Sequence, residues 1–331
     1  DITGDGKNVV KLSVGRYGSQ SGNALAYYMA PPIREIDVMW YDDGDMLPEY
    51  TELGPEVWNN TDTFDYNKKL SNVDFASDFN TPILDELTLA YERQLGEDMA
   101  MSLTGFFKKR HNLVASKGIK VDGTLETKAD YYLWKNYTVG ATSAPVYARY
   151  ASSVGTHYYN LPKAYDQYLA GQFVITKKLS NKWMADMSFV YMDWTSKRFA
   201  EETLDMTNFD YFNNGVNAPE TAGSGLTDIW INARWNFKLS GLYQMPWGLN
   251  LTAVFQAREG YPVFYNITTG SRPGNLPQVE VAEIGKKFGD DRLPTFWILN
   301  FGLEKTFKIS DTTSAVFFVD VYNATNNQQT L

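Results

Sequence analysis

Residues 229–244 read IWINARWNFKLSGLYQ, and apolar and polar side chains alternate along almost the whole stretch. One face carries Ile229, Ile231, Ala233, Trp235, Phe237, Leu239, Gly241 and Tyr243, and the other carries Trp230, Asn232, Arg234, Asn236, Lys238, Ser240 and Gln244. A period of two predicts a β-strand with one apolar and one polar face. The strand is much longer than the five or six residues usual in globular domains, and it suits a tilted crossing of a lipid bilayer, which takes about nine to eleven residues. We therefore predict part of a transmembrane β-barrel.

Four short connections, at residues 94–98, 178–182, 244–248 and 308–312, each join two alternating segments. Such connections are typical of antiparallel hairpins. The segments they join are 87–91 with 101–107, 169–175 with 183–191, 229–244 with 249–257, and 297–303 with 315–321. With a single strand at 9–17, the sequence predicts an all-β, antiparallel fold of about nine barrel strands.

Much longer polar, aromatic and acidic stretches lie between the hairpins, at about 18–83, 113–164, 197–227 and 264–293. Bacterial outer-membrane barrels have short periplasmic turns and long extracellular loops, so this asymmetry predicts that the four tight turns face the periplasm. Within the loops, residues 33–41 and 131–150 are strand-like and are predicted to form hairpins above the membrane. Five aromatic residues lie near predicted strand ends: Trp183, Tyr191, Tyr243, Trp247 and Trp297. They suggest the aromatic girdles found at the membrane interfaces of barrels, and the alternative is packing in the core of a β-sandwich.

The composition narrows the classes of function. Mean hydropathy is -0.37, and 15% of the residues are aromatic. The sequence contains no run of eighteen apolar residues of the kind that forms a transmembrane helix. The chain has no cysteine for a disulfide or a thiolate metal site, and its net charge of -9 argues against a nucleic-acid partner. His111 and His157 are the only histidines, which disfavours a histidine-based triad or a multi-histidine metal site. We therefore predict that the chain is not an enzyme.

Three groups of side chains are candidates for function. Charged residues predicted to face the barrel lumen, where they would contact a plug domain, are Glu86, Glu92, Arg234, Lys238, Arg258, Glu304 and Asp320. Loop aromatics predicted to bind a substrate, with loop packing as the alternative, are Trp40, Tyr41, Trp58, Trp134, Tyr158 and Tyr211. A candidate structural Ca²⁺ site, with a solvated acidic loop as the alternative, is formed by Asp42, Asp43, Asp45, Glu49 and Glu52. No other cofactor is predicted.

Several segments together resemble the TonB-dependent outer-membrane transporters, and most closely their Oar-like branch. The segments are LDELTLAYERQLG at 84–96, LSGLYQMPWGLN at 239–250, FQAREGYP at 255–262 and FVDVYNATN at 318–326, with the opening turn at 4–7 and the strand at 15–17. The order and spacing of these segments carry the resemblance, which extends over most of the chain.

The resemblance implies a barrel of about 22 strands with an N-terminal plug, energised by the TonB complex through a segment upstream of the barrel. Residues 1–331 would then be the C-terminal portion of the barrel, its nine strands being the thirteenth to the twenty-first. The plug and the final strand would lie outside this chain. Implied partners are outer-membrane lipid, the protein's own plug and the TonB complex, and the branch favours a peptide or protein substrate.

Two functions remain open. The chain belongs either to an active outer-membrane transporter or to a structural barrel whose surface loops bind a partner complex. A soluble carbohydrate-binding sandwich is a third interpretation, and the apolar face from Trp235 to Tyr243 argues against it.

Overall fold

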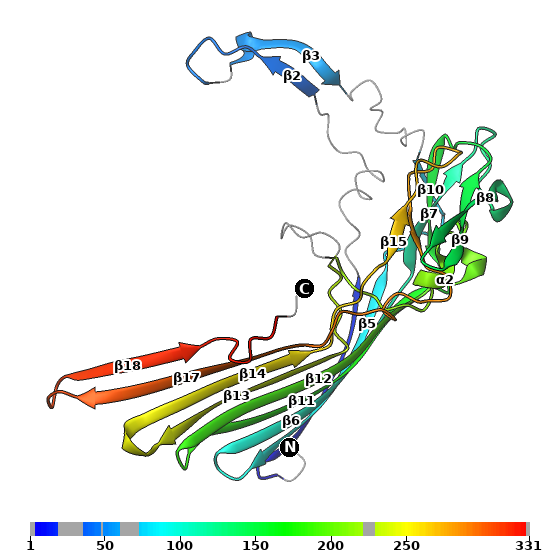
Figure 1. Cartoon of the computed structure of the whole chain (residues 1–331). Coiled ribbons are helices and arrows are strands. Elements are labelled where there is room, and N and C mark those ends of the chain that lie inside the picture. Colours follow the sequence, from blue (N-terminus) through cyan, green and yellow to red (C-terminus); the bar gives the residue numbers. More distant parts are fainter. Residues whose placement is uncertain (1–3, 19–35, 48, 60–72, 221–228, 329–331) are drawn as a thin grey trace.

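The computed structural model describes residues 4–18, 36–47, 49–59, 73–220 and 229–328, and these residues form an all-β fold with one large sheet (Figure 1). In spatial order the nine strands of this sheet are β1 (Asn8–Gly18), β5 (Ile83–Leu95), β6 (Met99–His111), β11 (Tyr165–Ser180), β12 (Trp183–Lys197), β13 (Trp235–Met245), β14 (Leu249–Arg258), β17 (Phe296–Lys308) and β18 (Ser314–Val321). Each strand pairs antiparallel with its neighbours. The predictions of an all-β fold, an antiparallel sheet and nine strands are confirmed.

Tight connections close one end of the sheet, where β5 meets β6, β11 meets β12, β13 meets β14 and β17 meets β18 (Figure 1). All four predicted turns are therefore confirmed. Gly96 in the first turn has φ 78° and Asn181 in the second has φ 49°. This left-handed region costs glycine nothing and asparagine little, so the residue types match the backbone that each turn requires.

The long connections leave the opposite end of the sheet and carry smaller sheets of their own (Figure 1). Their strands are β2 (Ile36–Trp40) with β3 (Leu53–Asn59); β4 (Val73–Phe75) with β10 (Gly155–Leu161) and β7 (Leu113–Ile119); β8 (Tyr131–Val139) with β9 (Thr142–Arg149); and β15 (Asn266–Thr268) with β16 (Glu280–Ala282). A single turn of α-helix, α2 (Phe209–Phe212), lies among them. The predicted hairpin at 131–150 is β8–β9, and the predicted strand at 33–41 contains β2.

The apolar cores of the described residues lie in these long connections. Val281 of β16 packs with Val139, Ala144 and Val146 of the β8–β9 hairpin. The next residue, Ala282, packs with a second cluster of Tyr211, Ala218 and Phe288. Successive strand residues point to opposite faces, so β16 joins the two clusters. Within the large sheet, by contrast, the buried hydrophobic side chains are only Ala90 and Ala170.

One strand is shorter than its sequence pattern predicts. The alternation begins at Ile229, but β13 begins at Trp235. The Arg234 carbonyl still accepts a hydrogen bond from the Met192 amide of β12. Residues 229–232 instead bond to other parts of the chain: the Ile231 amide donates to the Pro219 carbonyl, and the Asn232 side chain donates to the Asn217 carbonyl. Hydrogen bonds to distant loop segments therefore replace the sheet pairing that the local pattern favours.

Among the described residues, no helix has the length and apolar character needed to cross a membrane.

Candidate functional site

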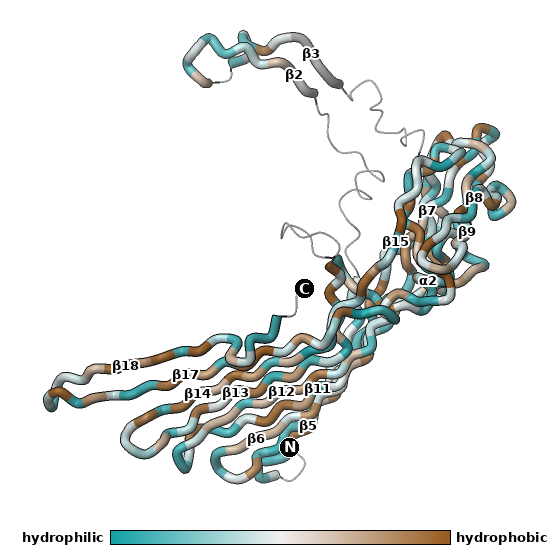
Figure 2. Tube along the Cα trace, viewed as in Figure 1, coloured by the Kyte–Doolittle hydropathy of each residue, from teal (hydrophilic) through white to brown (hydrophobic). Residues whose placement is uncertain are grey.

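The register of the nine strands gathers apolar side chains on one face of the sheet. Directly paired residues point to the same side, and one continuous row across four strands consists of Val14, Leu87, Phe107 and Leu169. Three of these side chains are exposed, with Val14 74%, Leu87 41% and Leu169 52% accessible, and Phe107 is partly exposed. Figure 2 shows brown segments recurring along the labelled strands of the large sheet. We call this side of the sheet the apolar face.

Polar and aromatic residues bound the apolar face. Toward the long connections, the row Arg16, Asp85, Lys109 and Gln167 borders the apolar row. On β12 and β13, Trp183 pairs with Tyr243 near the tight turns, and Tyr191 pairs with Trp235 at the other end. The eight steps from Trp183 to Tyr191 cover about 26 Å of strand. At the tilt of about 35–45° that barrel strands adopt, this length spans about 19–22 Å along the membrane normal, most of the apolar band of about 25 Å on membrane barrels.

The opposite side of the sheet, which we call the polar face, carries six of the seven predicted lumen residues. Following the register from β5 to β18 places Glu86, Glu92, Lys238, Arg258, Glu304 and Asp320 on this one side. Neighbours of opposite charge meet there. Lys11 lies 2.6 Å from Glu92, and Lys108 lies 2.9 Å from Glu86. Contact of these residues with a plug stays a prediction.

Arg234 is the exception, because it precedes the first residue of β13. It forms an ion pair with Glu259, 2.6 Å away and just beyond the end of β14, and Arg292 reaches the same carboxylate at 3.1 Å. Burial alone would raise the pKa of Glu259, but the hydrogen bonds from Arg234 and the charge of Arg292 hold the pKa below its usual value. Arg234 thus links the ends of β13 and β14, one residue before β13 begins, and its contact with a plug stays a prediction.

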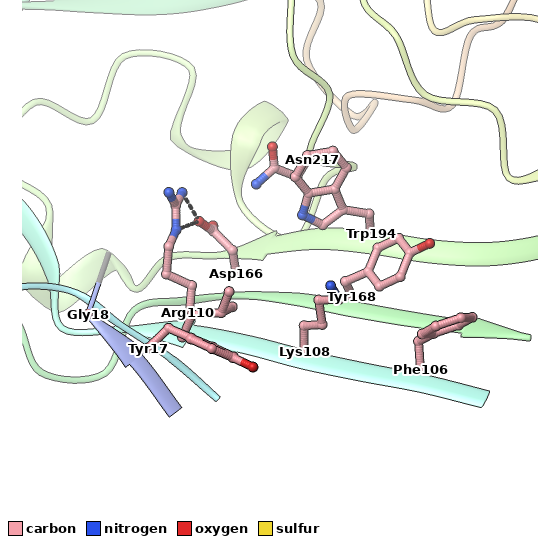
Figure 3. A pocket seen from close by; sticks show the side chains of 10 residues that line it. Tyr17, Gly18, Phe106, Lys108, Arg110, Asp166, Tyr168, Trp194 and Asn217 are labelled. Atoms are coloured by element: carbon pink, nitrogen blue, oxygen red, sulfur yellow. Dashed lines mark hydrogen bonds and ion pairs between the residues drawn. The ribbon is translucent and has the colours of Figure 1, made fainter. Parts of the chain in front are cut away.

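A pocket of about 730 Å³ opens on the polar face where the strands approach the long connections (Figure 3). Five strands and one loop line it with Tyr17, Gly18, Leu84, Phe106, Lys108, Arg110, Asp166, Tyr168, Trp194 and Asn217. The rings of Tyr168 and Trp194 meet edge to face, with centroids 6.3 Å apart. The pocket therefore combines aromatic surface with two cationic side chains.

Asp166 anchors the cationic side of the pocket. Its side chain is only 4% exposed, and it accepts hydrogen bonds from Arg110, from the Ser196 hydroxyl at 2.8 Å and from Arg198 at 3.0 Å. Sequence reasoning missed this group. Alternation alone would place Asp166 and Tyr168 on the polar face, but the pairing of β11 with β6 spans a long connection and cannot be read locally.

The predicted loop aromatics differ in their surroundings. Trp40 and Tyr41 are exposed, whereas Trp134 packs against the cluster around Val146, and Tyr158 stacks on Phe75 with centroids 5.4 Å apart. The Trp58 side chain lies outside the described residues.

Tyr211 is 6% exposed and packs against Phe264 and Phe288, and burial is the main cause that raises its pKa to about 12. Its ring belongs to a loop core, which favours the packing alternative for this residue.

The acidic loop between β2 and β3 brings four carboxylates together, with Asp42, Asp43, Asp45 and Glu52 offering oxygens within 4.8 Å of one another. Glu49, predicted as a ligand, is not in this group. It caps the short 3-10 helix Tyr50–Glu52, while Glu52 turns back toward the loop.

The Glu52 carboxylate already accepts hydrogen bonds from the Trp40 indole at 2.8 Å and from the amides of Asp43 and Glu49 at 2.8 and 3.2 Å. The Trp40 bond, with those from the two amides, holds the pKa of Glu52 below its usual value. Calcium binding stays a prediction. If the loop binds Ca²⁺, millimolar Ca²⁺ should slow proteolysis within residues 42–52. An unchanged rate would leave an acidic loop ordered by hydrogen bonds alone.

Comparison with known proteins yields distant likenesses among solved structures alone. No protein-family model and no curated protein matches the chain. Among solved structures, the outer membrane transporter YddB from Escherichia coli is similar at 12% sequence identity with a TM-score of 0.40, over 78% of this chain and 31% of that transporter. The chain therefore matches less than a third of the length of that protein.

Proposed function

We propose that this chain forms part of a β-barrel in a bacterial outer membrane and that the barrel is a transporter. The observation that carries the proposal is the division of the sheet into two faces, one apolar, exposed and bounded by aromatic residues, the other polar and charged. In water, an exposed apolar surface that extends over nine strands would promote aggregation. In a bilayer, the same face contacts lipid while the polar face lines an aqueous lumen.

The arrangement of the connections supports an orientation. The four tight turns would lie in the periplasm, and the long connections with their small sheets would stand at the cell surface. The two edges of the sheet require further strands, because unpaired backbone groups in lipid cost several kcal/mol each. We infer that these strands complete a barrel of about 22 strands.

We further propose energisation by the TonB complex, a plug held against the polar face, and a peptide or protein substrate. The resemblance of segments 84–96, 239–250 and 318–326 to TonB-dependent transporters supports these points. Charges of both signs on the polar face suit a plug that must be held by polar contacts and then released.

A second candidate function is a barrel that anchors a surface-binding module. The packed connections favour it, because they form cores around Val146 and Phe288. Ion pairs of buried arginines lie in the same connections, with Arg149 at 2.6 Å from Glu126 and Arg272 at 2.6 Å from Asp205. Loss of uptake when the TonB complex is deleted would favour transport, while normal surface binding without any energised uptake would favour the anchor.

Cysteine labelling tests the barrel and its orientation, because the chain has no cysteine of its own. Val121, exposed in a long connection, and Asp311, in a tight turn, are each replaced by cysteine in the full-length protein. On intact cells a membrane-impermeant maleimide should label V121C, and it should label D311C only after the outer membrane is permeabilised. Recovery of the protein in the soluble fraction without detergent would contradict the proposal.

A further inference from the structure

The pocket on the polar face has charges that its own residues do not balance. Arg110 and Arg198 share one carboxylate, Asp166, while Lys108 is matched by Glu86 at 2.9 Å. Counting these five groups leaves one positive charge in excess. Because Asp166 is buried and accepts hydrogen bonds on both oxygens, it has little capacity to bind anything further.

Two hydrogen-bond donors in the pocket have no acceptor among the described residues. Arg110 uses its Nε and Nη2 on Asp166, and no described residue accepts from its Nη1. The Trp194 indole nitrogen likewise lacks a partner in the described part of the chain. Figure 3 shows Lys108 beside Tyr168, and Arg110 bonded to Asp166 at the other side of the pocket. Both donors are therefore available to acceptor oxygens of a ligand.

Apart from Gly18 and the amide of Asn217, the remaining lining is apolar or aromatic. Tyr17 comes from β1, Phe106 from β6, Tyr168 from β11 and Trp194 from β12, so rings from four strands line one pocket. Aromatic rings bind planar or aliphatic groups through their faces and edges. Lys108 and Arg110 are two residues apart on one strand, so their Cα atoms are about 7 Å apart and both side chains rise from the same face.

We propose that this pocket binds a ligand that carries a carboxylate beside an aromatic or aliphatic group. Arg110 and Lys108 receive the carboxylate, with Arg110 held in place by Asp166. Trp194, Tyr168 and Tyr17 pack against the apolar part. The proposal rests on the proposed function, because it requires the polar face to line the lumen. Such a group occurs both at the end of a peptide and in a free organic acid.

The test is calorimetric titration of the full-length protein in detergent at low ionic strength. The probes are N-acetylphenylalanine, its uncharged amide, and Gly-Gly-Phe with a free or an amidated end. Both acids should bind at least tenfold more tightly than their amides, and raising the salt concentration should weaken binding. Tighter binding of the tripeptide acid would indicate a peptide source, and equal binding of the two acids a free acid.

The substitutions Lys108→Gln and Arg110→Gln should each weaken binding of the acids about tenfold, and Trp194→Ala should weaken both acids and amides. Lys109→Gln is the matched control, because Lys109 is on the same strand but projects from the opposite face, over the Tyr165 ring. Since Arg110 also bonds Asp166, Lys108→Gln keeps the test valid if the Arg110 variant does not fold.

Equal binding of acid and amide, or unchanged binding in K108Q, would overturn the inference. If the protein is folded and still requires detergent but binds none of the probes, the pocket proposal is also overturned, whereas the barrel proposal is unaffected. A protein that is folded without detergent would instead contradict the barrel proposal itself.

Discussion

Arg292 connects segments that are far apart in the sequence. Its guanidinium is 7% exposed and donates to the Asn232 carbonyl at 2.7 Å, the Asn232 side-chain oxygen at 3.1 Å and the Gly260 carbonyl at 3.2 Å. It also lies 3.1 Å from the Glu259 carboxylate. Burial lowers the pKa of Arg292, although Glu259 opposes that change, and the group remains charged at neutral pH.

Arg292→Met should therefore loosen residues 229–234 and 259–262. The change leaves the Asn232 and Gly260 oxygens without their donor and removes one cation from Glu259, a loss of about 2–3 kcal/mol by analogy with buried hydrogen bonds to charged groups. Hydrogen exchange should rise at least tenfold in these segments. Lys287→Met, an exposed residue of the same connection, is the control and should change little. Equal exchange in the two variants would contradict the role of Arg292.

Acid should weaken the same contact. The folded pKa of Glu259 is lower than its ordinary value of 4.5, so its stabilising effect is complete above pH 4.5 and is lost as the pH falls through the folded pKa. Hydrogen exchange of residues 229–234, corrected for intrinsic rates, should increase below pH 4.5. The Glu259→Gln variant should exchange faster already at neutral pH, and it should lack the increase below pH 4.5 that protonation of Glu259 causes. An identical pH profile in both proteins would assign the acid sensitivity to other groups.

The packing of residues 261–263 against residues 291–293 depends on Gly260. Two backbone hydrogen bonds join these segments: the Leu293 amide donates to the Tyr261 carbonyl at 2.9 Å, and the Val263 amide donates to the Asp291 carbonyl at 3.0 Å. A Cβ on Gly260 would lie 1.7 Å from the Leu293 carbonyl oxygen, so only glycine permits this approach.

Gly260→Ala should separate the two segments, and limited proteolysis between residues 259 and 295 should become several-fold faster. Gly270→Ala in the same connection is the matched control, because no atom lies within 4 Å of a Cβ there and the backbone is not left-handed. A protease-resistant G260A protein would show that the close approach is not needed for the packing.

The two faces of the sheet should respond differently to the same substitution. Leu239 lies on the apolar face between Trp235 and Tyr243, and Ser240 is next to it on the polar face opposite Asp186. An arginine at the lipid-facing midplane of a barrel costs about 2–4 kcal/mol, and one facing the lumen costs little. Leu239→Arg should therefore reduce assembly into the outer membrane, measured by the heat-modifiable folded band, whereas Ser240→Arg should assemble normally. Equal assembly of the two variants would place the bilayer elsewhere.

Much of the architecture is encoded locally. The period of two in Trp235–Met245, repeated in eight other strands, specifies which side chains share a face without knowledge of the partner strand. The four tight turns are equally local, because residues such as Gly96 and Asn181 suit the left-handed backbone that such turns require. The strand number, the antiparallel order and six of the seven predicted lumen-face residues therefore follow from short-range patterns.

Long-range pairing decided the rest. Residues 229–232 have a strand pattern but bond to Pro219, Asn217 and Arg292. Tyr211 lies in an aromatic-rich loop of the kind that binds ligands, but its ring is part of a loop core. The pocket exists because Tyr17, Arg110 and Trp194, on three different strands, are brought to one place by pairings across long connections. Alternation assigns each side chain to a face, but the register between distant strands and the competition from loop hydrogen bonds arise only when the folded chain brings those segments together.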